Sequence, residues 1–316
     1  MDFAPSMAQK AKVRMEETKR RNHFVPQFLL REFCESNRVF VFDKTKRKRY
    51  IATPQSSGFQ EYLYTLYSEE FDSNLMEDIF ARIESNAAPV IKHIVDSLTL
   101  PNDSRFNDLL LFVACMSARN PDVIGSYNDF VKEILRKTSL MITENKYDDF
   151  VNANPKTKFP SKEEMIAILH DPDQVEFTIL NDMLMAFVAQ SISILCDLLS
   201  RRNWYVGYVS LNKESELITS DFPVLLYWNK PGLSAYPPGF GLVSTTLAFV
   251  INPRVVLLAE FNQKLSKPIS LKHFIIRDIN RLHVKMANRF IYSKKPEFFF
   301  NSDTQDKVSS EALYES

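Results

Sequence analysis

Glycine is scarce in this sequence, with six residues in a chain of 316, against 25 phenylalanines and 12 tyrosines. Phosphate-binding loops need several glycines close together, because the backbone approaches the phosphate where a side chain would intrude. Neither a G-x-G-x-x-G nor a Walker sequence occurs. The composition therefore argues against the common nucleotide-binding loops.

Cysteine and histidine are also few. Cys34, Cys115 and Cys196 lie far apart, each within an apolar helical pattern, which favours free buried thiols in a reducing cytosol over disulfides or a zinc site. The five histidines form no H-E-x-x-H or clustered Cys/His spacing, and no G-x-S-x-G elbow is present. We therefore expect no metal, no cofactor and no nucleophilic catalysis.

The chain has no excess of charge of either sign and no long apolar run. Its formal net charge is zero, so the whole molecule has no global attraction to nucleic acid or membrane. The N-terminus is polar, unlike a signal peptide, and no run approaches the ~18 apolar residues of a membrane span. We expect a cytoplasmic protein that does not bind membranes, of unknown oligomeric state.

The order of the periodic segments predicts an α+β fold. It is a largely helical single domain over residues 22–293, with a small mixed or antiparallel sheet built from N- and C-terminal strands. The helical middle covers about 69–200, between a polar tail at 1–21 and a flexible tail at 294–316. Strands are expected at 38–42, 49–52, 61–66, 204–210, 217–219, 243–250 and 255–258.

The breaks between these segments carry further expectations. Pro89 should kink or split the helix at 69–98, and residues 144–160 read as a loose polar connection. Ser161 and Glu164 form a capping box. The last helix should run from about 270 to 292. A turn is expected at Asn212-Lys213, and the turn-rich residues 230–241 are typical of a lid or rim.

The stretch from Asn22 to Phe33 concentrates the first candidate site residues. Pro26 suits the first position of a short helix, because its fixed φ is already helical. His23 and Gln27 would then lie at a helix N-terminus, where backbone N–H groups favour anions. The alternative is that both side chains only fix this helix against the rest of the protein.

This stretch resembles the opening signature, His-x-x-Pro-Gln-x-x-Leu-Arg-x-Phe, of a mostly bacterial family of unknown function. Later motifs are similar to the same family and extend the likeness over residues 22–293. The resemblance implies relatives and no established reaction. The motifs are Ile83-Glu84, Ala118-Arg119-Asn120-Pro121, the Thr-Ser-Asp-x-Pro-Val motif at 219–224, Ile279-Asn280, and 287–293.

Asp221, in the Ser-Asp-Phe-Pro turn, is the best second half of a site. If the two ends of the chain share a sheet, its carboxylate could orient His23 as a general base. Gln27, Arg119 and Asn280 would position the substrate or stabilise charge. The alternative is that Asp221 only caps its own backbone, as an aspartate in such a turn commonly does. Glu84 either pairs with Arg119 as a structural bridge or faces a cleft.

Residues 19–49 are strongly basic, with ten Lys or Arg against three acids. One interpretation is a solvated hairpin tip that protects a sheet edge; the other is contact with a phosphate backbone. On the second interpretation the substrate-binding residues are Arg21, Lys46, Arg47, Lys48 and Arg49.

One further pattern lies in the last helix. Arg277 and His283 resemble the Arg-polar-x-His motif of the metal-independent HEPN ribonucleases. A chain with 17 arginines and five histidines is expected to contain such a spacing by chance, so the match carries little weight.

The leading hypothesis is an intracellular bacterial hydrolase, nuclease-like and independent of metal, that acts on a phosphate-bearing substrate as a toxin or phage-defence effector. The alternative is a non-catalytic module that binds nucleic acid or a partner protein through the basic hairpin and the 230–241 loop. A purely scaffolding relative is the third reading.

Overall fold

The computed structural model describes residues 18–171, 173–210, 216–230, 236–302, 305 and 307–315. Its largest sheet has five strands in the order β10-β5-β9-β8-β7, all antiparallel except the β10–β5 pair. Almost every residue of β8 and β9 is buried, as expected for strands covered on both faces. The strands are β5 (Asn203–Tyr208), β7 (Val224–Trp228), β8 (Thr245–Asn252), β9 (Val255–Glu260) and β10 (Ile269–Ser270).

A second sheet joins the two ends of the chain in the order β3-β2-β11-β6. Tyr292 pairs with Val41 on one side and with Thr219 on the other. The α+β fold with a sheet shared by N- and C-terminal strands is therefore confirmed. The strands are β2 (Val39–Asp43), β3 (Lys48–Ala52), β6 (Thr219–Ser220) and β11 (Phe290–Ser293).

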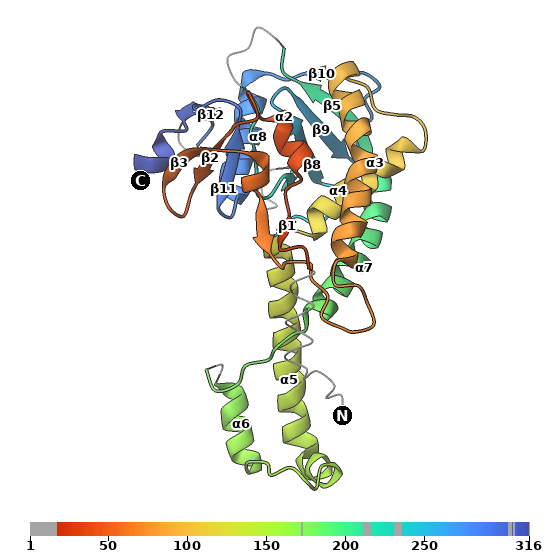
Figure 1. Cartoon of the computed structure of the whole chain (residues 1–316), viewed down its shortest axis with the longest axis vertical. Helices are drawn as coiled ribbons and strands as arrows, with labels where there is room; N and C mark the ends of the chain where they lie inside the picture. Colours follow the sequence, from red (N-terminus) through yellow and green to blue (C-terminus); the bar gives the residue numbers. More distant parts are fainter. Residues whose placement is uncertain are drawn as a thin grey trace, which may run out of the picture.

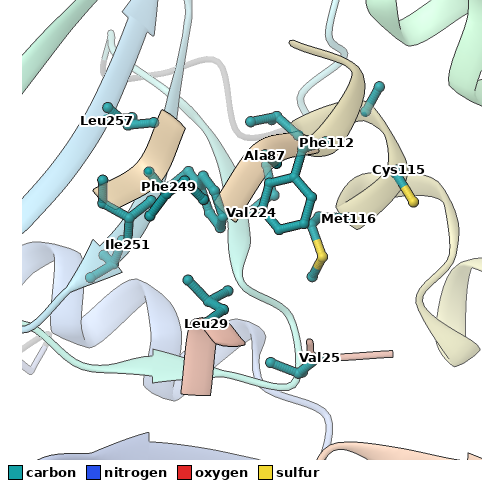
Figure 2. Close-up of a cluster of buried hydrophobic side chains, with 14 of the residues drawn as sticks. Val25, Leu29, Ala87, Phe112, Cys115, Met116, Val224, Phe249, Ile251 and Leu257 are labelled. Atoms are coloured by element: carbon teal, nitrogen blue, oxygen red, sulfur yellow. The ribbon is translucent and has the colours of Figure 1, made fainter. Parts of the chain in front are cut away.

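Helices α2, α3 and α4 pack against the five-stranded sheet, and α7 packs against α4 (Figure 1). Figure 2 shows where their side chains meet the strands: Leu29 of α2, Ala87 of α3 and Phe112 of α4 approach Phe249 of β8. Because α4 is apolar on nearly all sides after its first turn, its residues from Leu109 to Ala118 are almost all buried in this layer. The helices are α2 (Gln27–Glu32), α3 (Leu75–Ser97), α4 (Arg105–Ala118) and α7 (Asn181–Ser200).

Two helices leave the body of the protein as an arm, α5 (Pro121–Ala153) and α6 (Lys162–His170) (Figure 1). The expected loose connection at 144–160 is wrong over its first ten residues, because α5 continues through them with one non-helical residue, Lys146. Its polar residues are adequate helix formers, and α6 packs against them. The capping box of Ser161 and Glu164 is confirmed.

The C-terminal part departs most from expectation. The predicted helix at 270–292 ends early, as α8 (His273–Met286), and residues 290–293 form the inner strand β11. The aromatic and β-branched sequence Phe-Ile-Tyr suits a strand, and pairing with β2 and β6 decides its conformation. The described residues beyond 293 form β12 (Phe299–Phe300), β13 (Val308–Ser309) and α9 (Ala312–Glu315).

The structure also differs from the predictions at residues 61–66 and at Pro89. The predicted strand at 61–66 is wrong: β4 (Phe59–Glu61) ends where it should begin, and pairs with β1 (Arg21–His23). Pro89 does not split α3, which is one helix in the structure. Most of the tail 1–21, the turn Asn212-Lys213 and residues 231–235 of the 230–241 loop lie outside the described residues.

The expectation that no apolar segment is long enough to span a membrane is wrong for helix α7. It is long and apolar enough to cross a membrane by length and composition, a test that core helices of soluble proteins also pass. In this fold α7 packs against α4 and α5.

Candidate active site

His23 is placed by the short β1 strand, which pairs with β4 directly before the chain enters α2. Helix α2 begins at Gln27, and Pro26 precedes it with an extended ψ of 139°. Six residues make a weak helix dipole, and His23 does not lie among the first N–H groups as an anion ligand.

The His23 ring is held at both nitrogens. Nδ1 lies 3.1 Å from the Ser57 carbonyl oxygen, and Nε2 lies 3.1 Å from the Gln27 side-chain nitrogen. A carbonyl only accepts, so Nδ1 carries the proton and Nε2 is the acceptor. Burial lowers the pKa of His23, and the charges of Arg119 and Arg21 act in the same direction. The imidazole is therefore neutral at pH 7, with its basic nitrogen facing Gln27.

Glu84 and Arg119 meet beside this histidine. Arg119 Nη1 lies 2.8 Å from Glu84 Oε1, and the guanidinium lies over the Phe80 ring at 5.3 Å. The Arg119 side chain is fully buried, whereas that of Glu84 is 24% exposed. Glu84 thus combines the two expected alternatives: it forms an ion pair with Arg119, and it also faces a cleft.

These groups enclose a cleft of about 330 Å³ between α2 and α3, lined by His23, Gln27, Arg31, Glu77 and Glu84 among others. Arg119 lies behind the wall, where its charge orients Glu84. Arg31 stands at the rim, with a guanidinium nitrogen 3.4 Å from Gln27 Oε1.

Glu77 is a cleft residue that the sequence analysis missed. It precedes Glu84 by seven residues, two helical turns, so both carboxylates face the same side of α3. Asn22, in the signature stretch, donates to Glu77 Oε2 at 3.2 Å. Burial raises the pKa of Glu77; the charge of Arg119 opposes this and that of Glu84 adds to it. The seven-residue spacing was the signal that would have found it.

Asp221 does not pair with His23, and the expected carboxylate–histidine dyad is wrong. Its carboxylate accepts the backbone N–H groups of Asn288, Arg289 and Phe290 at 2.7–3.0 Å. Asp221 is 5% exposed, and burial raises its pKa while these three donors lower it. Asp221 therefore has a structural role, as in the alternative, but the backbone it caps is the start of β11 and not its own turn.

Asn280 is also a structural group. Its side chain accepts from the Ile218 N–H and donates to the carbonyls of Glu216 and Phe299, inside a fully buried position. It therefore ties α8 to β6 and β12, away from the cleft.

The Arg277 and His283 pair does not form a catalytic site. His283 is fully buried with Nδ1 3.0 Å from Ser220 Oγ, while Arg277 donates to Asn301. Burial lowers the pKa of His283 to about 3.

The basic hairpin lies apart from the cleft. In Figure 1, strands β2 and β3 of the hairpin lie at the left, whereas helices α2 and α3, which border the cleft, lie to their right. Lys46, Arg47, Lys48 and Arg49 are exposed, and none of them lines the cleft. Lys44 instead donates to the Val284 and Ala287 carbonyls at the end of α8. Only Arg21, stacked 4.9 Å from the Phe59 ring centroid, approaches His23 among the predicted substrate-binding residues.

Across the described ranges, no three His, Cys, Asp or Glu side chains stand close enough together to hold a metal ion. An apolar cavity of about 410 Å³, lined by Tyr127, Ile194 and Phe222 among others, contains none of the predicted site residues.

The fold and cleft thus define an α+β protein in which an N-terminal histidine and two helical carboxylates share one recess. Residues 21–297 match the family described as "Protein of unknown function (DUF4238)", and the chain belongs to it. No curated protein and no solved structure matches the chain.

Proposed function

We propose that this protein is a hydrolase that cleaves a phosphate-bearing substrate, of the nucleic-acid kind, in the cleft between α2 and α3. One observation carries the proposal: His23 is neutral, has its tautomer set by Ser57, and presents Nε2 to the cleft. A general base needs a lone pair on the reactive side and a pKa near or below working pH.

In the proposed reaction, His23 Nε2 takes a proton from water and the resulting hydroxide attacks phosphorus. Gln27 must first turn its amide away from Nε2, where it now donates. The bond from phosphorus to the leaving oxygen then breaks, and that oxygen needs a proton. Glu77 is the candidate donor of this proton, because it lines the same cleft and burial raises its pKa.

The cationic rim supports a phosphate-bearing substrate. Arg31 lies at the mouth of the cleft, and Arg21 is exposed near His23. Arginine side chains suit phosphate because their planar donors match its oxygens. Glu84, neutralised by Arg119, adds little repulsion toward such a substrate.

The test is a cleavage survey with single- and double-stranded DNA and RNA, using the wild type, His23→Ala and Glu77→Gln. General acid–base groups contribute about 10²–10⁴-fold, so each variant should lose at least about 100-fold in rate. Thermal midpoints should stay within a few degrees. His170→Ala, an exposed histidine on the arm, is the matched control and should retain full activity.

Glu84→Gln separates chemistry from structure within the same cleft. It removes the charge that balances the buried Arg119, and breaking such a pair costs about 3–5 kcal/mol. Glu77→Gln should leave the unfolding midpoint unchanged, while Glu84→Gln should lower it. No cleavage of any substrate by the wild type, or full activity of His23→Ala, rejects the proposal.

A second candidate function rests on the hairpin. Lys46, Arg47 and Lys48 form an exposed basic tip remote from the cleft, which suits binding of nucleic acid without chemistry. Neutralising the three should weaken binding and flatten its salt dependence. An enzyme would lose only substrate capture, with the rate at saturating substrate unchanged.

We also infer that the protein acts in the cytoplasm, as a toxin or phage-defence effector. Induced expression in a bacterial host should then slow growth for the wild type and spare it for His23→Ala. Equal growth inhibition by both would reject that role.

A further inference from the structure

A second polar cavity lies beside the cleft. It has a volume of about 290 Å³, near the lower end of the ~300–1,000 Å³ typical of small-molecule sites. Residues from both ends of the chain line it: Phe59 and Gln60 of β4, Asp122 at the start of α5, and Asn288 and Phe290 around the start of β11. Asp221, predicted as a catalytic residue, also lines the cavity, with its carboxylate bonded to the backbone N–H groups of 288–290; the five residues named above were not predicted as site residues.

Two stacks of a guanidinium on an aromatic ring border this cavity. Arg21 Cζ lies 4.9 Å from the Phe59 ring centroid, and Arg289 Cζ lies 4.6 Å from that of Phe290. Both rings are half-buried. Unpaired bases are commonly bound by stacking on aromatic rings and on arginine guanidinium planes.

The open edge of the cavity is polar and carries a carboxylate. Asp122 is exposed, and its Oδ1 accepts from the Asn288 side-chain amide at 2.8 Å. Oδ2 is left to accept from a ligand, and the exposed Gln60 amide offers both a donor and an acceptor. An ionised carboxylate has acceptors and no donor, so it favours a base edge rich in N–H donors. Guanine presents two side by side, N1–H and N2–H₂, whereas uracil presents one.

This cavity lies near both the cleft and the basic hairpin. The Phe59 ring, which lines the cavity, lies 5.6 Å from the His23 ring, centroid to centroid. On the other side, Arg289 donates to Asp43 at 2.8 and 3.0 Å, at the end of β2 where the basic turn begins. The cavity therefore lies between the catalytic histidine and the exposed lysines.

We propose that this cavity binds one base of a nucleotide, guanine by preference, with its donor edge on Asp122 and its ring against Phe59 and Phe290. The attached phosphate then extends past Arg21 toward His23. Among the described residues, no carboxylate forms a salt bridge with Arg21. Its guanidinium is therefore suited to bind a phosphate. The inference rests on the proposed function in that it names the substrate class of the same cleft.

The test is calorimetric titration of the full chain with GMP and UMP. GMP should bind more tightly than UMP, and Asp122→Ala should weaken GMP binding at least tenfold. Asp129→Ala, an exposed aspartate further along α5, is the matched control and should bind as the wild type does. Asn288→Ala, which removes the partner of Asp122, should weaken binding without removing the carboxylate.

Binding and cleavage separate this inference from the proposed function. No binding of GMP at millimolar concentration, or unchanged binding by Asp122→Ala, would overturn the inference, whatever the cleavage result. Absence of cleavage with Asp122-dependent GMP binding would reject the catalytic proposal alone. A short guanine-containing single strand that binds at least tenfold more tightly than GMP identifies a strand as the natural source; equal affinity identifies the free nucleotide.

Discussion

At the scale of single residues, the buried polar groups divide into those that hold backbone and those that face solvent. The side-chain oxygens of Asp221 and Asn280 accept hydrogen bonds from backbone N–H groups, so neither residue serves as a catalytic base. His23 and Glu77 are only partly buried, and both line a cleft that water can enter. The catalytic account therefore depends on the second group.

Asp221→Asn should destabilise the protein. An amide has only one acceptor oxygen, while three backbone N–H groups now bond the carboxylate. Hydrogen bonds to charged groups contribute about 1.5–3 kcal/mol each, so a loss of at least about 2 kcal/mol is expected in urea unfolding. Asp129→Asn is the exposed control. An unchanged midpoint together with lost cleavage would instead make Asp221 a catalytic group.

His283 should make the protein sensitive to acid. Its pKa is about 3 in the folded protein and near 6.5 when unfolded, so below pH 6.5 the unfolded chain binds the extra proton. Stability therefore falls as pH drops from 6.5 toward 3, by about 1.4 kcal/mol per pH unit for this group.

The measurement is the urea midpoint of the wild type and His283→Gln between pH 7 and pH 4. The variant should lose less stability over this range, whatever its starting value. His170→Gln, at an exposed site, should show the wild-type slope. Equal slopes in all three proteins would show that His283 is not the source.

At the scale of elements, local pattern and tertiary contact disagree in two places, β11 and the end of α5. Local signals correctly marked α3, inside the helix expected at 69–98, and the start of α6, at the capping box of Ser161 and Glu164. Strand β11 could not be predicted from the local sequence, because its conformation depends on distant partners: the Asp221 carboxylate and strands β2 and β6. Likewise, α5 extends beyond residue 143 because α6 packs on it.

Pro89 lies inside α3 without ending it, which makes a prediction for this element. Proline lacks the N–H that would bond the Ser85 carbonyl, and interior proline costs a helix up to about 3 kcal/mol relative to alanine. Pro89→Ala should therefore raise stability by about 1–3 kcal/mol, measured by urea unfolding. Asn86→Ala, at an exposed neighbouring site, should change it by no more than about 0.5 kcal/mol. A destabilised Pro89→Ala would show that the rest of the fold requires the proline.

At the scale of the whole molecule, the arm and the body are separate in their packing. Among the described residues, none between Ile124 and Leu184 contributes a buried side chain to the main core. Replacing residues 136–176 with a short Gly/Ser linker should lower the thermal midpoint by less than about 4 °C, which corresponds to roughly 1 kcal/mol. Loss of the folded state on this deletion would contradict the separation.

The sequence alone predicted four members of the cleft region: His23, Gln27, Glu84 and Arg119. It did so because each lies in a short motif with a polar residue among apolar ones. It could not predict which carboxylates face His23, since that depends on how α3 packs beside α2. Asp221 was therefore assigned to the wrong partner, and Glu77 was missed.

The central claim is that His23 acts as a neutral base in the cleft. The most direct test is the pH dependence of kcat/KM for cleavage of the best substrate, which reports pKa values of the free enzyme. The lowered pKa of His23 predicts an acid limb with its midpoint below pH 6.5. A midpoint at or above pH 6.5, or the same acid limb in His23→Ala, would contradict the account.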